Sequence, residues 1–106
     1  MTRPSDERVQ DILAAIDRCN TYRDYLKSAD RGAMAYDAIL RNLAVIGEAV
    51  RALPSEFKAE RPHTPWTSMA GLRNIVVHEY FRVDHNLIRD VVDNDLNTLA
   101  ASLRSS

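Results

Sequence analysis

Two long stretches of this chain carry apolar residues at the three- and four-residue spacing of an amphipathic helix, separated by a short break. The first stretch runs from Ser5, a residue type suited to a helix N-terminus, to Leu26. The second is expected to begin with Asp30 as its capping residue and to end before Pro54. Helices of about 20 residues joined by a tight turn are expected to pack antiparallel.

The rest of the chain continues the helical pattern. Residues 54–65 contain three prolines and mixed charges, and they are expected to form a loop without an element of its own. A shorter helix follows, starting near Trp66 or a few residues later, and Asp84 then caps a fourth long helix. No useful strand-like alternation occurs. The sequence predicts one all-α domain, residues 1–106: an up-and-down antiparallel bundle of four main helices, plus a short helix that bears the motif described next.

The segment from Arg73 to Tyr80 places a permanent cation, an imidazole and a phenol within eight residues. On a helical wheel, one side of this segment is apolar and faces the expected core, namely Leu72, Ile75 and Val76. The polar side carries the candidate functional groups, namely Arg73, Asn74, His78 and Tyr80. Val77 is apolar within that polar side and indicates contact with another protein surface. Glu79 lies on the apolar side, which we interpret as the helix fraying or ending by His78.

An arginine and a histidine together can perform the two tasks of RNA cleavage without a metal ion. Arg73 can hold phosphoryl oxygens in a bidentate grip, and the imidazole of His78 can accept and donate protons. The two residues lie about 140° apart on one helix. They therefore meet better across a symmetric pair of helices, which predicts a homodimer. The alternative is purely structural, with the arginine satisfying helix carbonyls and the histidine capping the helix end.

Residues elsewhere in the chain give supporting indications. Gly47 lies in the middle of a predicted helix, where glycine is unfavourable, and indicates the close approach of another helix, such as the one bearing Arg73. Glu48 is predicted to orient Arg73 through an ion pair; otherwise it is an ordinary surface acid. Trp66 is expected to close the open end of the bundle, with a base-stacking platform as the alternative.

Composition narrows the class of protein further. The net charge of −1 excludes a global attraction to nucleic acid, so any RNA contact must be local or be built by two subunits. The single Cys19 cannot form an internal disulfide and is expected to be buried, which fits a cytoplasmic protein. No apolar run has the length of a membrane span. The histidines show no metal-ligand spacing and no phosphate-binding loop is present, so we expect neither a metal ion nor a cofactor.

Several motifs in order along the chain resemble one known family. They are Tyr-Asp-Ala-Ile-Leu-Arg-Asn-Leu at 36–43, Ile-Gly-Glu-Ala at 46–49, the Pro-x-x-Pro-Trp elbow at 62–66, Gly-Leu-Arg-Asn at 71–74 and His-Glu-Tyr-Phe at 78–81. In this order and composition the chain resembles the HepT-like toxins, a branch of the HEPN superfamily of small helical ribonuclease domains. The resemblance extends from about residue 8 to residue 103.

This resemblance implies a specific activity and specific partners. Family members are dimeric, metal-independent RNA endonucleases that act as toxins in type VII-like two-gene systems, each beside a minimal nucleotidyltransferase antitoxin. Arg73 and His78 would be catalytic at the dimer cleft, with Asn74 as a polar helper. Tyr80 would accept AMP from the antitoxin, which blocks the RNA site. Otherwise Tyr80 is an amphipathic residue at the rim of the bundle.

Two other functions stay open at this point. The domain can instead be a non-catalytic helical partner that docks on the nucleotidyltransferase and binds nucleotide, or a plain helical dimer with a chance motif. An outward pair of Arg73 and His78 favours the nuclease, because a docking module has no need of both. The expected substrate is RNA, with tRNA and mRNA both compatible, and DNA is not expected.

Overall fold

The computed structural model describes residues 5–104, and this part of the chain consists of helices and their connections, without a strand. In chain order the helices are α1 (Ser5–Arg23), α2 (Gly32–Ala52), α3 (Ser55–Ala59), α4 (Trp66–Ala70), α5 (Leu72–Arg82), α6 (His85–Asp90), the π-helical η1 (Val91–Leu96) and α7 (Asn97–Arg104). The predicted all-α bundle is confirmed. The predicted domain, residues 1–106, also includes residues 1–4 and 105–106, which lie outside the described residues.

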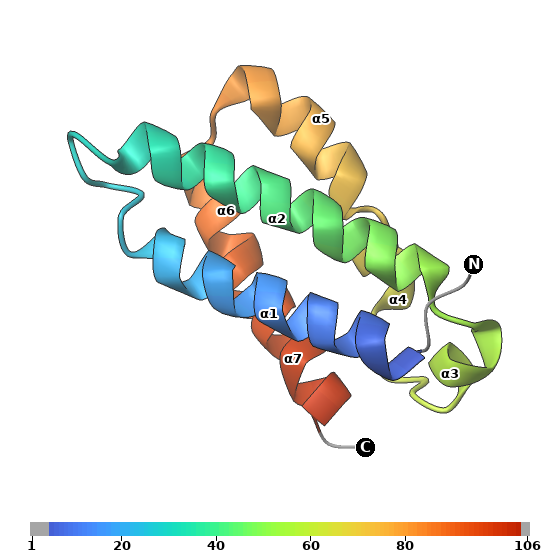
Figure 1. Ribbon diagram of the computed structural model, residues 1–106. Helices are drawn as coiled ribbons and strands as arrows, with labels where there is room; N and C mark the ends of the chain where they lie inside the picture. Colours follow the sequence, from blue (N-terminus) through green and yellow to red (C-terminus); the bar gives the residue numbers. More distant parts are fainter. Residues whose placement is uncertain (1–4, 105–106) are drawn as a thin grey trace.

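Four helical segments alternate in direction, namely α1, α2, the motif helix α5, and the continuous segment α6–η1–α7. α1 and α2 lie side by side and antiparallel, and α5 crosses the upper side of α2 in Figure 1. α5 is antiparallel to α2, because its first turn lies against Gly47 and its later residue Glu79 contacts Tyr36 near the start of α2. The continuous segment α6–η1–α7 returns along α1. The motif helix α5 thus packs on one side of α2, and its other side is left exposed.

The core consists mainly of aliphatic side chains from all the long helices. The largest side chains that are fully buried are Ile12, Ile16, Ile39, Leu43, Ile46, Val50, Met69, Leu72, Ile88, Val92, Leu96 and Leu99. Cys19 is buried among them, as predicted, and burial raises the pKa of its thiol to about 12. A thiol so far from ionisation is a poor nucleophile, so the site must be sought elsewhere.

The last long helix differs from the regular one that the sequence predicts. Its middle turn, Val91–Leu96, is π-helical, which inserts an extra residue into the turn. Asp93 within this turn pairs with Arg23 at the end of α1, and the Arg23 guanidinium lowers the pKa of the Asp93 carboxyl. The π-helical turn thus carries the ion pair between this helix and α1.

Two local predictions are wrong. Asp30 does not cap α2: the helix begins at Gly32 after Arg31, and the Asp30 carboxylate accepts the Ser28 hydroxyl instead, at 2.7 Å. Residues 54–65 are not wholly loop, because α3 forms within them. Proline fixes φ at a value compatible with a helix start, and Pro54 directly precedes α3 with φ −61°.

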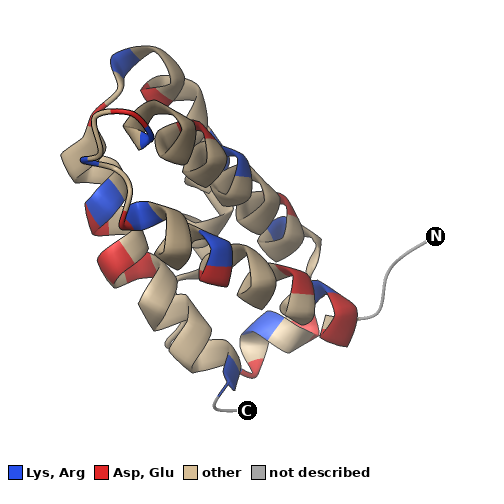
Figure 2. Ribbon diagram, turned by 60° about the vertical axis from the view of Figure 1, so that its left-hand side comes forward, with Lys and Arg blue, Asp and Glu red and all other residues tan. Residues whose placement is uncertain are grey.

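The outer surface carries charges of both signs. Basic and acidic segments are interspersed along the helices in Figure 2, in keeping with the net charge of −1. Because charges of both signs are interspersed, any anion-binding surface on this chain must come from a few well-placed cations.

None of the helices between residues 5 and 104 combines the length and apolar character needed to cross a membrane.

Candidate functional site

The motif helix α5 is held against the bundle by its first turns. Leu72 is fully buried, and Ile75 and Val76 are half-buried against the core, as the helical wheel predicts. At the contact with α2, a Cβ added to Gly47 would lie 3.4 Å from the backbone N of Arg73 and 3.6 Å from the Leu72 Cβ. The predicted close approach at Gly47 is therefore present, and it fixes the position of Arg73 relative to α2.

Arg73 points to the α2 side of α5. Its Nη1 donates to the Glu48 carboxylate at 3.0 Å, so the ion pair expected between these residues forms. The side chains of Arg73 and Glu48 are 60% and 57% exposed. An ion pair with this much exposure to solvent contributes little to the stability of the fold. The contact holds one edge of the guanidinium, and its other donors have no partner among residues 5–104.

His78 lies on the opposite side of α5. It lines a cavity of about 320 Å³ beside α6, together with Asn74, Ile75, Glu79, Arg82 and Leu87. Asn74 is one helical turn before His78, and both side chains are exposed. The structure thus brings Asn74 and His78 to one cavity and Arg73 to Glu48. It does not bring Arg73 and His78 of one chain to the same side of the helix.

The crest of α5 between these two sides is apolar and exposed. Val77, Tyr80 and Phe81 are 62%, 65% and 83% exposed. The rings of Tyr80 and Phe81 meet edge to face, with centroids 4.9 Å apart. Clustered exposed apolar side chains are typical of protein contact surfaces. The crest therefore has the character of an interface, flanked by a cation on one side and an imidazole on the other.

Glu79 is buried, with only 3% of its surface exposed, and the prediction that α5 frays or ends by His78 is wrong. The helix continues to Arg82 because the carboxylate has partners inside the bundle. The Tyr36 hydroxyl donates to the Glu79 carbonyl oxygen at 2.9 Å and reaches its carboxylate at 3.4 Å. The backbone N–H of Asp84 donates to the same carboxylate at 3.0 Å. We call Tyr36, Glu79 and the Asp84 N–H the Glu79 clamp.

The Glu79 clamp surrounds a strained turn. Val83 follows α5 in the left-handed region, with φ 53°, a conformation that costs a β-branched residue about 1–3 kcal/mol. Its N–H donates to the Glu79 carbonyl at 3.1 Å, and the Asp84 carboxylate then caps α6 at the Leu87 N–H, as predicted. Burial and the Glu79 charge raise the pKa of Tyr36 to about 12. The clamp fixes where α5 ends, and thereby the turn that carries Tyr80.

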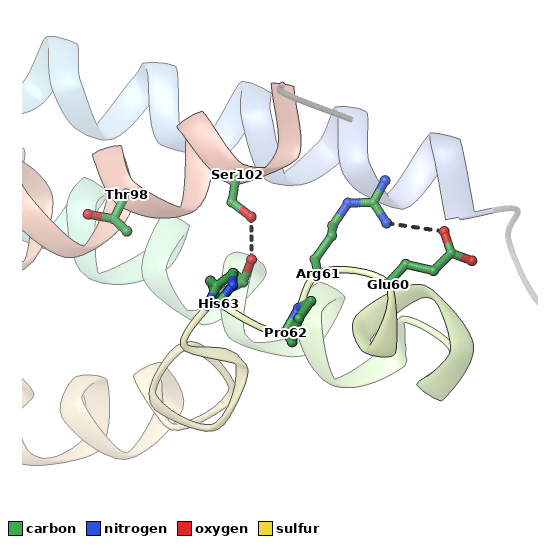
Figure 3. Close-up of a pocket in the computed structure, with 7 residues that line it drawn as sticks. Glu60, Arg61, Pro62, His63, Thr98 and Ser102 are labelled. Atoms are coloured by element: carbon green, nitrogen blue, oxygen red, sulfur yellow. Dashed lines mark hydrogen bonds and ion pairs between the residues drawn. The ribbon is translucent and has the colours of Figure 1, made fainter.

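A second cavity lies away from the motif helix. It has a volume of about 500 Å³ and is lined by Glu60, Arg61, Pro62, His63, Thr64, Thr98 and Ser102. Figure 3 shows Arg61 extending toward Glu60 and the Ser102 hydroxyl engaged within the cavity; its partner is Thr64. Within the lining, Thr64 pairs with Ser102 and Arg61 with Glu60, and the cavity shares no residue with α5. It does not contribute to the candidate site.

Trp66 closes the elbow that leads into the motif helix. Its indole Nε1 donates to the carbonyls of Lys58 and Arg61, both at 3.1 Å, and its ring meets Phe57 edge to face. These contacts fit the expected role of Trp66 in closing the end of the bundle. Within residues 5–104, no cluster of three His, Cys, Asp or Glu side chains is placed to hold a metal ion.

Comparison with known proteins gives a consistent set of relatives. A family model described as "Ribonuclease HepT-like" matches residues 9–105. "Probable ribonuclease HepT" of Thermococcus cleftensis is 32% identical over 105 residues, covering 93% of this chain and 92% of its own length. Two proteins of Methanocaldococcus jannaschii, "Putative RNase MJ0127" and "Putative RNase MJ1380", are 39% and 38% identical over 83% and 69% of this chain. The chain spans 69% and 66% of their lengths. No solved structure gives a significant match.

The Glu79 clamp predicts a stability effect. Replacing Glu79 by Ala removes the acceptor of the part-buried Asp84 N–H and a buried partner of the Tyr36 hydroxyl. We expect a loss of about 1–3 kcal/mol in the free energy of unfolding, measured by urea denaturation. Glu79→Gln keeps an acceptor oxygen and should cost less. Glu56→Ala, at an exposed position of α3, is the control and should stay within about 0.5 kcal/mol of the unmodified protein. Equal stability of the two alanine variants would contradict the role of the clamp.

Proposed function

Because the chain belongs to the HepT-like ribonuclease family, we propose that it is a metal-independent RNA endonuclease whose active site forms between two copies of the chain. The observation that carries this proposal is the arrangement on α5. Arg73 and His78 are both exposed, on opposite sides of an exposed apolar crest. A second α5 packed on that crest in a twofold arrangement would bring Arg73 of one copy toward His78 of the other.

The chemistry follows from the properties of the two side chains. The 2′-hydroxyl of the substrate attacks the neighbouring phosphate, and the 5′-oxygen leaves. His78 takes the proton from the 2′-hydroxyl and then supplies one to the leaving 5′-oxygen. Arg73 remains charged and neutralises the phosphorane oxygens as charge accumulates on them. Asn74, in the cavity with His78, helps to position the substrate. The products are a 2′,3′-cyclic phosphate and a 5′-hydroxyl.

Glu48 supports Arg73 in this scheme. Its ion pair occupies only Nη1 of the guanidinium, so a planar edge of the cation stays available for phosphate. The pair also limits the rotamers of a long side chain before RNA binds. We assign Glu48 a positioning role, because its carboxylate contacts the Arg73 guanidinium and not the reacting phosphate.

The same crest offers a means of regulation. Tyr80 is 65% exposed in the single chain and lies at the Arg73 edge of the crest, outside the strip of Val77 and Phe81 on which the second copy packs. Its phenol is therefore open to an enzyme that transfers AMP. We propose that a cognate minimal nucleotidyltransferase antitoxin modifies Tyr80, which makes the pair a toxin–antitoxin system. AMP on Tyr80 would add bulk and negative charge on the side of α5 that carries Arg73, about 20° away on the helical wheel. RNA would then be excluded by sterics and by charge.

The catalytic assignment predicts that His78→Ala and Arg73→Ala each lower RNA cleavage by at least about 100-fold, with an unchanged helical circular dichroism spectrum. Cleavage of total tRNA and of an mRNA transcript is measured on denaturing gels, in EDTA, with the product ends identified by mass spectrometry. Arg18→Ala, an exposed change on α1, is the matched control and should cleave normally. Full activity of either motif variant would remove that residue from the mechanism, and an inactive unmodified protein would favour a docking function.

The regulatory assignment predicts a mass increase of one AMP unit or more on Tyr80 after incubation with ATP and the proposed cognate nucleotidyltransferase. The modified protein should no longer cleave RNA. Tyr80→Phe should escape both modification and inhibition, because it lacks the acceptor hydroxyl. Tyr25→Phe, an exposed tyrosine on another part of the surface, serves as the control. An adduct on another residue, or none, would refute the assignment of Tyr80.

A further inference from the structure

The side of α5 that carries His78 holds a second cation that the proposed mechanism does not use. Asn74, His78 and Arg82 follow one another at intervals of four residues and so form one row along the helix. All three line the cavity of about 320 Å³ between α5 and α6. Ile75 and Leu87 give this cavity an apolar wall. The cavity therefore combines an imidazole, an amide and a guanidinium with an apolar surface.

Arg82 has no competing partner. It makes no hydrogen bond or ion pair with any residue in the described range 5–104, whereas Arg73 and Arg89 both pair with carboxylates. Glu79 also borders the cavity, but its carboxylate accepts the Asp84 N–H at 3.0 Å and the side chain is almost fully buried. The guanidinium of Arg82 is thus an unneutralised positive charge in the lining of this cavity.

The size and spacing of the cavity suit one unit of a nucleic-acid strand. A volume of about 320 Å³ lies at the lower end of the range for small-molecule sites, so the cavity takes one nucleotide and not a longer segment. His78 and Arg82 are separated by one helical turn, about 6 Å of axial rise. This rise is close to the spacing of successive phosphates along an extended strand.

We propose that this cavity is a subsite for the nucleotide next to the cleaved linkage. Arg82 binds the phosphate that flanks the cleaved one, through paired N–H donors. The apolar surface of Ile75 and Leu87 contacts the sugar or base. The cleaved phosphate then lies at the His78 end of the cavity. This inference rests on the proposed ribonuclease function and adds Arg82 as a binding residue for RNA.

The test compares Arg82→Ala, Arg82→Lys and the control Arg18→Ala, which changes an exposed arginine on α1. One probe is a fluorescein-labelled 12-nucleotide single strand with 2′-O-methyl sugars, which cannot be cleaved by attack of a 2′-hydroxyl. A second probe is AMP, which distinguishes a strand subsite from a site for free mononucleotide. Cleavage of the matching RNA gives kcat and KM separately. Circular dichroism checks that each variant is folded.

Arg82→Ala should weaken binding of the strand about 10-fold, raise KM by a similar factor and leave kcat within about threefold. The slope of log affinity against log salt should fall by about 0.7, the value for one phosphate contact on a single strand. Arg82→Lys should keep the slope and part of the affinity, because it retains the charge without the bidentate geometry. Arg18→Ala should match the unmodified protein.

Three outcomes overturn the inference. If the unmodified protein cleaves RNA and Arg82→Ala binds and cleaves equally well, the subsite is wrong and the proposed ribonuclease stands. If Arg82→Ala loses AMP binding but keeps the affinity for the strand, the cavity serves a free nucleotide. If the unmodified protein neither binds the strand nor cleaves RNA, the proposed function fails and the subsite fails with it.

Discussion

The attachment of α5 to α2 at both of its ends is the constraint on which the candidate site depends. At the first turn, Gly47 lets the backbone of α5 come close enough that an added Cβ would lie 3.4 Å from the Arg73 nitrogen. At the last turns, Tyr36 holds Glu79 through its backbone and side-chain oxygens. A helix fixed in this way cannot rotate about its own axis. Its exposed crest and the groups on either side of it therefore keep their directions.

Arg73 leans toward Glu48 on α2, whereas His78 opens into the cavity beside α6, so the fixed helix keeps these two groups on opposite sides within one chain. In the proposed mechanism one chain therefore supplies half of each site. The apolar crest between the two groups supplies a surface on which a second copy can pack. The net charge of −1 gives no long-range attraction to RNA, so the proposed RNA binding rests on single guanidinium groups such as those of Arg73 and Arg82.

The parts of this structure that follow from local chemistry could be predicted from the sequence. Helical periodicity predicts the four main helices, and Asp84 caps α6 as expected for its residue type. The ion pair of Glu48 with Arg73 follows once Gly47 marks the contact between their helices. The Glu79 clamp could not be predicted from the sequence, because it joins Tyr36 and Glu79, which are 43 positions apart. The sequence analysis interprets Glu79 as a sign that the helix ends, whereas the structure buries this side chain and gives it hydrogen-bond partners. The left-handed Val83 depends on that clamp and has no sequence signal, since β-branched residues avoid this conformation.

The claim that each active site takes Arg73 from one copy and His78 from the other is tested most directly by mixing two inactive variants. Arg73→Ala and His78→Ala chains are unfolded together, refolded as a mixture and assayed for RNA cleavage, beside each variant refolded alone. In a mixed dimer one of the two sites regains both residues, so random pairing should restore up to about a quarter of the unmodified activity. A mixture that forms dimers yet stays as inactive as its components would contradict the shared site.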